Sequence, residues 1–158
     1  MSDDVKICGH GLYLEEFEIG MRFRTFSRTI TESDLVNFIN ATGYTEILFT
    51  DTEFLKHSSA IKGRVVPASL IYSFSEGLYT PVIQNTGLAF LEAKIEVKAP
   101  TFVNDTIHIE GEITESRRTS KGDRGLVRTM NRVLNQRGEV VLTYNPLRMV
   151  KGKNYNPS

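Results

Sequence analysis

The sequence has no tryptophan and only one cysteine, Cys8, among 158 residues, which excludes an internal disulfide framework. It has no net charge, with 19 basic and 19 acidic side chains. This balance argues against a nucleic acid or an anionic membrane as partner, because both attract a basic surface. No apolar run approaches the ~20 residues that span a bilayer, and the acidic residues 1–4 lack the apolar core of a secretory signal. These absences predict a cytoplasmic protein.

Metal-ligating side chains are also scarce. Cys8 and His10 have no further ligands at the spacing of a metal site, and His57 and His108 fall on the polar faces of a predicted helix and strand. We therefore expect neither a metal nor a cofactor.

The first half of the chain changes from alternating to helical spacing. Residues 21–30 alternate in the manner of a strand. Thr31 then offers a hydroxyl cap, Glu32 and Asp34 suit the positive end of a helix dipole, and Gly43 ends the helix.

Two further helices are predicted after a loop over residues 44–50. The shorter one begins at Asp51, with Asp51 or Thr52 as its cap and Asp51 the better candidate, and is broken by Gly63. The longer one has Pro67 in its first turn and is apolar on most sides, so we expect it to be buried. Its broad apolar stripe consists of Leu70, Ile71, Phe74 and Leu78.

From Gly87 onward the period is two, which predicts four long strands in an antiparallel meander. The last two, about 125–136 and 139–150, are joined by a glycine-containing turn at 135–138. The pattern predicts an α+β hotdog fold, a curved antiparallel sheet around one long central helix. Residues 1–158 then form one domain with flexible tails at 1–10 and 151–158. Two subunits joined edge to edge would hide the exposed strands, so we expect a dimer.

Several short motifs resemble the MaoC-like (R)-enoyl-CoA hydratase/dehydratase family over about residues 12–150. Each motif is weak alone, but together they occur in the family's order and spacing. They are Arg28–Asp34, Thr42–Gly43, Thr50–Asp51, Gly63–Val66, Ser75–Leu78, Phe90–Glu92, Asn104–Thr106 and Asn135–Val141.

The resemblance implies a hotdog fold, a dimer or higher oligomer, and an acyl thioester ligand, usually acyl-CoA, in a tunnel at the subunit interface. It also implies reversible addition of water across a 2-enoyl thioester. In catalytic members an Asp and a His five residues later activate that water and protonate carbon 2.

The chain departs from the family pattern at these two positions. Tyr44 stands at the Asp position and Phe49 at the His position, while Glu46 replaces an Asn. The family's Ala-His-Gly before the buried helix is replaced by residues 66–68, Val-Pro-Ala. The standard Asp/His dyad is therefore absent. Neither phenylalanine nor a neutral tyrosine can replace it, because neither is a useful base.

Tyr44 and Glu46 are the candidate catalytic residues that remain in this loop. Glu46 can serve as a base for hydration or for thioester hydrolysis, and Tyr44 can donate a hydrogen bond to a carbonyl. The alternative is that Tyr44 and Phe49 fill space and Glu46 is solvated. Glu76, on the buried helix, is a second candidate base for a thioesterase.

The candidate substrate-binding residues are Phe49, Arg64, Ala68, Ser69 and Leu70. The resemblance places the amino end of the buried helix at the thioester oxygen, where backbone N–H groups of residues 68–70 stabilise negative charge. Arg64 lies beside this end and is either structural or directed at a phosphate.

Three functions stay open at this point. The first is a hydratase/dehydratase that works with non-standard residues, and the second is a thioesterase using Glu46 or Glu76. The third is a non-catalytic acyl-thioester-binding subunit, active beside a second chain that carries the dyad.

Overall fold

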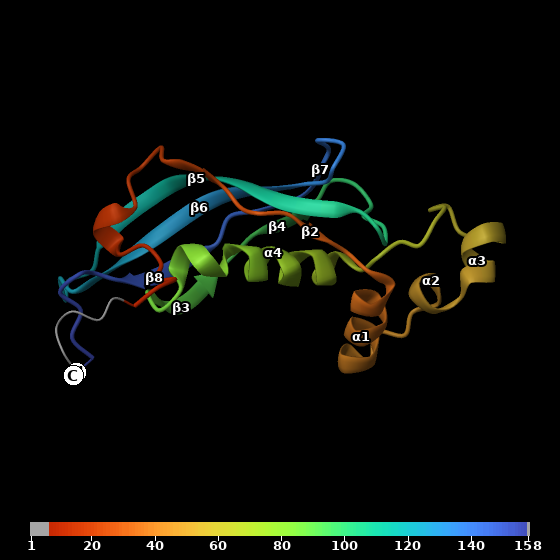
Figure 1. The fold of residues 1–158 in the computed structure, drawn as a ribbon, viewed down its shortest axis with the longest axis horizontal. Helices are drawn as coiled ribbons and strands as arrows, with labels where there is room; N and C mark the ends of the chain where they lie inside the picture. Colours follow the sequence, from red (N-terminus) through yellow and green to blue (C-terminus); the bar gives the residue numbers. More distant parts are fainter. Residues whose placement is uncertain (1–6, 158) are drawn as a thin grey trace.

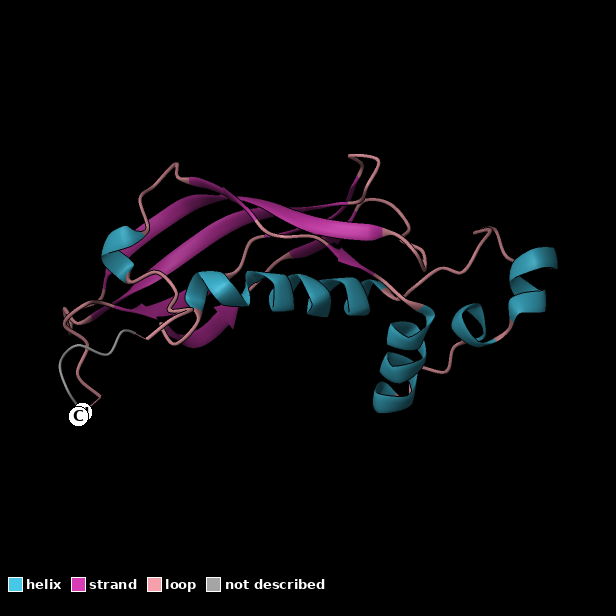
Figure 2. Cartoon of the chain, viewed as in Figure 1, coloured by secondary structure: helices cyan, strands magenta, loops and turns pink. Residues whose placement is uncertain are grey.

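A sixteen-residue helix, α4 (Ala68–Ile83), lies along one face of an eight-stranded antiparallel sheet (Figure 1). The computed structural model describes residues 7–157. Figure 2 shows α4 beneath the strands, with the other α-helices gathered beyond its amino end. This is the expected α+β arrangement of a long central helix and an antiparallel sheet.

The sheet order differs from the predicted meander. Strands β1 and β2 pair with β5, β6 comes next, β7 and β8 both pair with β6, and β4 and β3 form the far edge. The strands are β1 (Arg22–Arg24), β2 (Arg28–Thr29), β3 (Gly87–Glu92), β4 (Ile95–Val97), β5 (Thr106–Arg118), β6 (Arg124–Leu134), β7 (Val140–Tyr144) and β8 (Leu147–Lys151).

The prediction that residues 87–98 lie next to the following strand was therefore wrong. Residues 98–105 carry the chain past the amino end of α4, where the Val66 amide donates to the Thr101 carbonyl at 2.9 Å. Only β5, β6 and β7 follow one another as neighbours, and the turn at 135–138 connects the last two as expected.

Three predicted strands are interrupted. Residues 21–30 form β1 and β2, separated by a bend at which Phe26 is exposed. The strand predicted at 139–150 breaks at Pro146, which has no N–H for the ladder. The strand predicted from Gly87 onward breaks at the same level, between β3 and β4, where Lys94 and Asn145 exchange two hydrogen bonds.

The caps predicted for the first two helices are confirmed. Thr31 and Asp34 form a reciprocal capping box on α1 (Glu32–Thr42), and Gly43 adopts a left-handed conformation at its end. Asp51 accepts from the Glu53 and Phe54 amides at the start of α3 (Thr52–His57). Helix α3 ends at His57 rather than near Gly63, and a short helix, α2 (Ile47–Thr50), lies within the predicted loop.

The main core lies between α4 and the sheet. Leu70, Ile71 and Tyr79 of α4 pack in one cluster with the inward-facing apolar residues of the strands, among them Ile107, Ile109, Val133 and Leu142. The short 3₁₀ helix η1 (Leu14–Glu16) covers a second, smaller cluster around Ile113 and Val150.

The alternation rule failed at His108 and on β4. His108 is buried rather than on a solvated face, and burial lowers the pKa of its imidazole. On β4, Ile95 and Val97 are exposed at the sheet edge, while Glu96 forms ion pairs with two lysines.

Of the expected tails, residues 1–6 and 158 lie outside the described part of the chain. The amides of Gly152 and Lys153 donate to the Asp123 carbonyl and the Glu15 carboxylate. Within residues 7–157, no helix combines the length and the apolar character needed to cross a bilayer.

Candidate functional site

The amino end of α4 presents two free backbone donors. Pro67 is the residue before the helix, and its carbonyl accepts from the Leu70 and Ile71 amides at 3.0 and 3.4 Å. Across residues 7–157, no acceptor meets the amides of Ala68 and Ser69. The expectation of three free donors was therefore wrong for Leu70, because that amide closes the first turn, while Leu70 itself is buried in the core.

A cavity of about 40 Å³ lies beside this end of the helix. Ala68 and Ile71 of α4 line it together with Val97 of β4 and the loop residues 99–101. The sheet closes it through Val141 and Leu142. Of the candidate binding residues only Ala68 lines this cavity, and Ser69 is exposed beside it.

Helix α2 brings Tyr44 and Phe49 together. Their ring centroids are 5.3 Å apart at an angle of 52°. Phe49 is 6% exposed and belongs to the main core, whereas Tyr44 is 45% exposed. The structure therefore places an apolar ring at the position where the resemblance expects a histidine.

The Glu46 carboxylate caps α2. Its Oε2 accepts from the Leu48 amide at 2.9 Å, and the side chain is otherwise on the surface. No hydrogen bond within the described residues reaches its Oε1. Neither Tyr44 nor Glu46 lines the cavity beside Ala68.

Arg64 clamps the helical segment onto the rest of the chain. Its Nε and Nη2 donate to both oxygens of Glu32 on α1, and its Nη1 donates to the Phe49 carbonyl. The guanidinium thus joins α1 to α2 by a fork that matches the carboxylate geometry. Of the two alternatives for Arg64, these contacts support the structural one.

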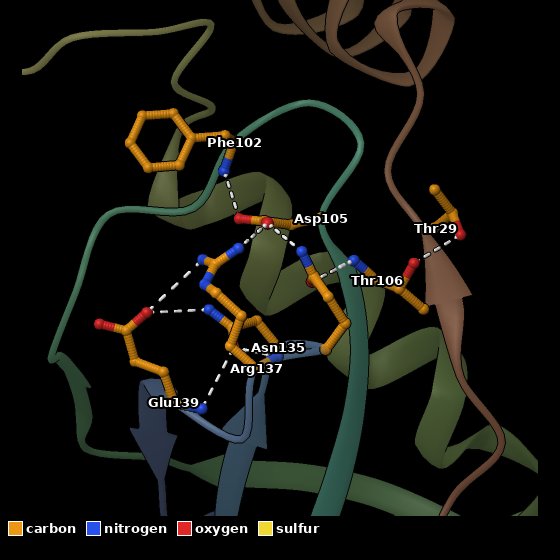
Figure 3. A network of polar contacts seen from close by, with 8 residues as sticks. Thr29, Phe102, Asp105, Thr106, Asn135, Arg137 and Glu139 are labelled. Atoms are coloured by element: carbon orange, nitrogen blue, oxygen red, sulfur yellow. Dashed lines mark hydrogen bonds and ion pairs between the residues drawn. The ribbon is translucent and has the colours of Figure 1, made fainter.

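The cavity loop is held by a buried carboxylate, Asp105 (Figure 3). It accepts from the Phe102 amide, from Gln136 Nε2 at 2.8 Å and from Arg137 Nη1 at 3.0 Å. Burial alone raises the pKa of Asp105, but these hydrogen bonds and the charge of Arg137 outweigh it and lower the pKa below its usual value. Two of the quoted motifs, 104–106 and 135–141, meet in this network.

Glu76 is engaged in an ion pair. Both of its oxygens accept from Nη2 of Arg148, which is almost fully buried on β8. The guanidinium also lies over the Tyr79 ring at 4.5 Å. Both oxygens of Glu76 are occupied by this guanidinium, which counts against Glu76 as the base of a thioesterase.

A set of buried polar side chains in the sheet was missed at the sequence level. Asn131 and Thr129 on β6 and Tyr144 on β7 are at most 1% exposed, and among the described residues their side-chain polar atoms make no hydrogen bond of normal geometry, although the Asn131 amide interacts with the Tyr144 hydroxyl. The available signal was their phase: Thr129 and Asn131 lie between Val127 and Val133 at every second position, so all four share the inward register of a strand.

The family model of the FAS1-like dehydratase domain region matches residues 18–144. The chain belongs to this family. The match covers all of α4, the helical segment before it and the strands as far as β7. No curated protein sequence gives a significant match.

Several solved structures share this fold. A monoamine oxidase regulatory protein from Archaeoglobus fulgidus has a TM-score of 0.82 at 29% identity, covering 91% of this chain and 97% of its own. A MaoC-like dehydratase from Rhodospirillum rubrum has a TM-score of 0.81 at 22% identity over 90% of this chain and 99% of its own. An R-hydratase from Pseudomonas aeruginosa has a TM-score of 0.75 at 22% identity, covering 90% and 88%.

The fold is therefore the hotdog fold, which is shared with structures named MaoC-like dehydratase and R-hydratase, and the matching family model is that of a dehydratase domain, in line with the motifs.

Proposed function

We propose that this chain binds an acyl thioester, in the form of acyl-CoA, at the amino end of α4. The observation that carries the proposal is the pair of free amides at Ala68 and Ser69 beside a mostly apolar cavity, in a protein of the dehydratase family. Two aligned N–H groups at the positive end of a helix stabilise negative charge on a thioester oxygen. The cavity walls are mostly apolar, like the carbon chain of an acyl group, but the cavity of about 40 Å³ must widen to admit that chain, since ligand pockets usually reach roughly 300 Å³ or more.

In the catalytic form of this proposal, the reaction is hydration of a 2-enoyl thioester. Glu46 takes a proton from water as the water oxygen bonds to carbon 3, and then returns a proton to carbon 2. The free Oε1 of Glu46 supports this role, and the exposed hydroxyl of Tyr44 is the donor to the thioester carbonyl. Motion of α2 toward Ala68 is required, since neither side chain lines the cavity.

A second candidate function is a non-catalytic binding subunit. The burial of Phe49 in the core and the use of Glu46 as a helix cap favour it, because both residues then have structural roles. In this form a second chain with an intact Asp/His pair supplies the proton transfers.

We also propose that the protein is a cytoplasmic homodimer or higher oligomer joined through the edge formed by β3 and β4. Four large apolar side chains are exposed along this edge, and no further strand from residues 7–157 lies beside it. They are Phe90, Leu91, Ile95 and Val97. The cavity beside Ala68 includes Val97, so a partner at this edge would close the site.

The turnover test uses crotonyl-CoA, with enoyl absorbance and free thiol followed together. The variant is Glu46→Gln, and the matched control is Glu53→Gln, an exposed carboxylate on α3. Loss of enoyl absorbance without thiol release, abolished only in Glu46→Gln, supports a hydratase. Thiol release identifies a thioesterase instead.

If neither signal changes while butyryl-CoA raises the melting temperature, the non-catalytic subunit is the correct form. Absence of both turnover and any thermal shift with acyl-CoA contradicts the proposed function as a whole.

A further inference from the structure

The face of the sheet opposite α4 carries a second cavity, of about 340 Å³. Ile107 and Ile109 of β5 pack into the main core beside α4, so His108 and Glu110, which alternate with them, lie on the outer face. The bend between β1 and β2, the strand β5 and the turn between β6 and β7 line the cavity. Its volume is at the lower end of the range for small-molecule sites, roughly 300–1,000 Å³.

One wall of this cavity is fixed by the Asp105 network (Figure 3). Gln136 donates from Nε2 to Asp105 at 2.8 Å and accepts from the Thr106 amide at 2.9 Å. Asn135 accepts from two amides of its own turn, and the Thr106 hydroxyl is bonded to the Thr29 hydroxyl. The polar side chains of this wall are thus already paired, so they give the cavity a defined shape and leave its free binding groups on the other side.

Arg24 brings an uncompensated positive charge to the cavity. Its guanidinium forms no hydrogen bond or ion pair within residues 7–157. Glu110 lies directly opposite Arg24 in the ladder of β1 and β5, but it is paired with Arg132 of β6 at 2.8 Å. The next pair in the same ladder, Arg22 and Glu112, carries opposite charges. Arg24 therefore remains as one positive charge without a counter-charge.

His108 and Ser27 add two polar groups with unused capacity. The His108 side chain is 10% exposed, and its Nε2 lies 3.7 Å from Oε1 of Glu110, beyond the length of a normal hydrogen bond. Burial and the charge of Arg24 lower the pKa of this imidazole and outweigh the opposite effect of Glu110, so the ring is uncharged at neutral pH. The exposed hydroxyl of Ser27 makes no hydrogen bond among the described residues.

A carboxylate group satisfies these three side chains together. A guanidinium fork binds both oxygens of a carboxylate, and a serine hydroxyl and a neutral imidazole each donate one further hydrogen bond. The one uncompensated charge of Arg24 matches a singly charged anion. A doubly charged phosphate would leave a negative charge without compensation next to Glu110.

We propose that Arg24, Ser27 and His108 form a binding site for a small organic carboxylate on the outer face of the sheet. The site goes beyond the proposed thioester function, because the sheet separates it from the amino end of α4 and each site can be tested without the other.

The test is a titration of the ¹⁵N-labelled full chain with sodium propionate at constant ionic strength, followed by NMR. We expect saturable shifts of the Arg24 Nε–H signal and of the His108 ring signals. Binding should also raise the pKa of His108, because the carboxylate compensates the charge of Arg24 that lowers it. Propionamide, which has a similar size but no charge, should give no saturable shift.

The variant Arg24→Gln removes both the fork and the charge. Its matched control is Arg22→Gln on the same strand, since Arg22 does not line this cavity. We expect propionate affinity to fall roughly tenfold or more in Arg24→Gln and roughly threefold in Ser27→Ala, as the loss of a charged and of a neutral hydrogen bond would give. In Arg22→Gln the affinity should be unchanged.

Two ligand-free measurements guard against misfolded variants. Because the Arg24 guanidinium makes no hydrogen bond or ion pair with the described residues, Arg24→Gln should keep the melting temperature of the original protein. The same variant should raise the pKa of His108, since one of the causes that lower it is removed. Ser27→Ala carries the test if Arg24→Gln does not fold.

The other results overturn the inference. Equal binding of propionate and propionamide, or an affinity for propionate unchanged in both Arg24→Gln and Ser27→Ala, shows that these residues do not recognise a carboxylate. Tighter binding of inorganic phosphate than of propionate overturns the assignment of a singly charged ligand. Shifts that do not saturate and are spread over exposed basic side chains mean an adventitious ion only.

Discussion

Single side chains hold the loops around the candidate site in place. Asp105 accepts hydrogen bonds from two segments that are far apart in the sequence, and Arg64 joins Glu32 to the carbonyl of Phe49. Neither residue lines the cavity beside Ala68, so both would affect a ligand there only by holding other residues in place.

Asp105 makes stability depend on pH in the acid range. Its folded pKa lies below the value of about 3.9 for an unfolded aspartate, so its stabilising contribution is full above that value. The contribution is lost as the pH falls through the folded pKa. Urea unfolding of Asp105→Asn between pH 7 and pH 3 should show a flatter decline than the original protein. At pH 7 the variant should lose about 1–3 kcal/mol. Parallel curves would show that Asp105 is not the titrating group.

Arg64→Lys tests the guanidinium fork. A lysine keeps the charge but cannot hold both Glu32 oxygens and the Phe49 carbonyl at once. We expect a loss of about 1–2 kcal/mol in the free energy of unfolding, measured by chemical denaturation. Arg132→Lys is the control, since Arg132 makes one exposed contact with Glu110. Equal effects of the two substitutions would contradict the clamp.

At the scale of elements, Phe23 of β1 fits against β5 because Gly111 has no side chain. A Cβ at this position would approach Phe23 Cζ to 2.2 Å. Gly111→Ala should therefore destabilise the fold by about 1–3 kcal/mol through displacement of the Phe23 ring. Thermal unfolding measures this loss of stability. Gly122→Ala is not a suitable control, because Gly122 has a positive φ that an alanine would strain. Gly77→Ala, where the added Cβ meets nothing within 4 Å, is the matched control.

The helices were predictable because their signals are local. The Thr31 box, the Asp51 cap and the Gly43 stop each act within a few residues, and the structure confirms all three. The sheet order was not predictable in this way, because the placement of residues 87–97 at the far edge depends on pairing with strands that come about 50 residues later.

The candidate site was predictable only in outline. The amino end of α4 follows from residues 63–68, but the free donors are two rather than three, because the Pro67 carbonyl accepts from the Leu70 amide. Nothing in the sequence indicated that Arg148 pairs with Glu76, because the two residues lie 72 positions apart in the chain.

At the scale of the whole molecule, the proposed dimer is joined through the edge of β3 and β4. Val97 is 59% exposed on this edge, and Val97→Lys would set a charge against its copy in an edge-to-edge dimer. Analytical ultracentrifugation should show a dimer for the original protein and a monomer for this variant. Met130→Lys, on a central strand, should remain dimeric. A monomeric original protein, or a dimer unaffected by Val97→Lys, would contradict the proposed interface.

The most direct measurement is the amide spectrum of ¹⁵N-labelled protein during titration with butyryl-CoA and, separately, with CoA. If the thioester oxygen lies at the amino end of α4, the amide signals of Ala68 and Ser69 shift with butyryl-CoA and stay in place with CoA alone. Leu70, whose amide is already bonded to Pro67, shifts less. Signals of Ala68 and Ser69 that stay unchanged at saturating butyryl-CoA would contradict the account.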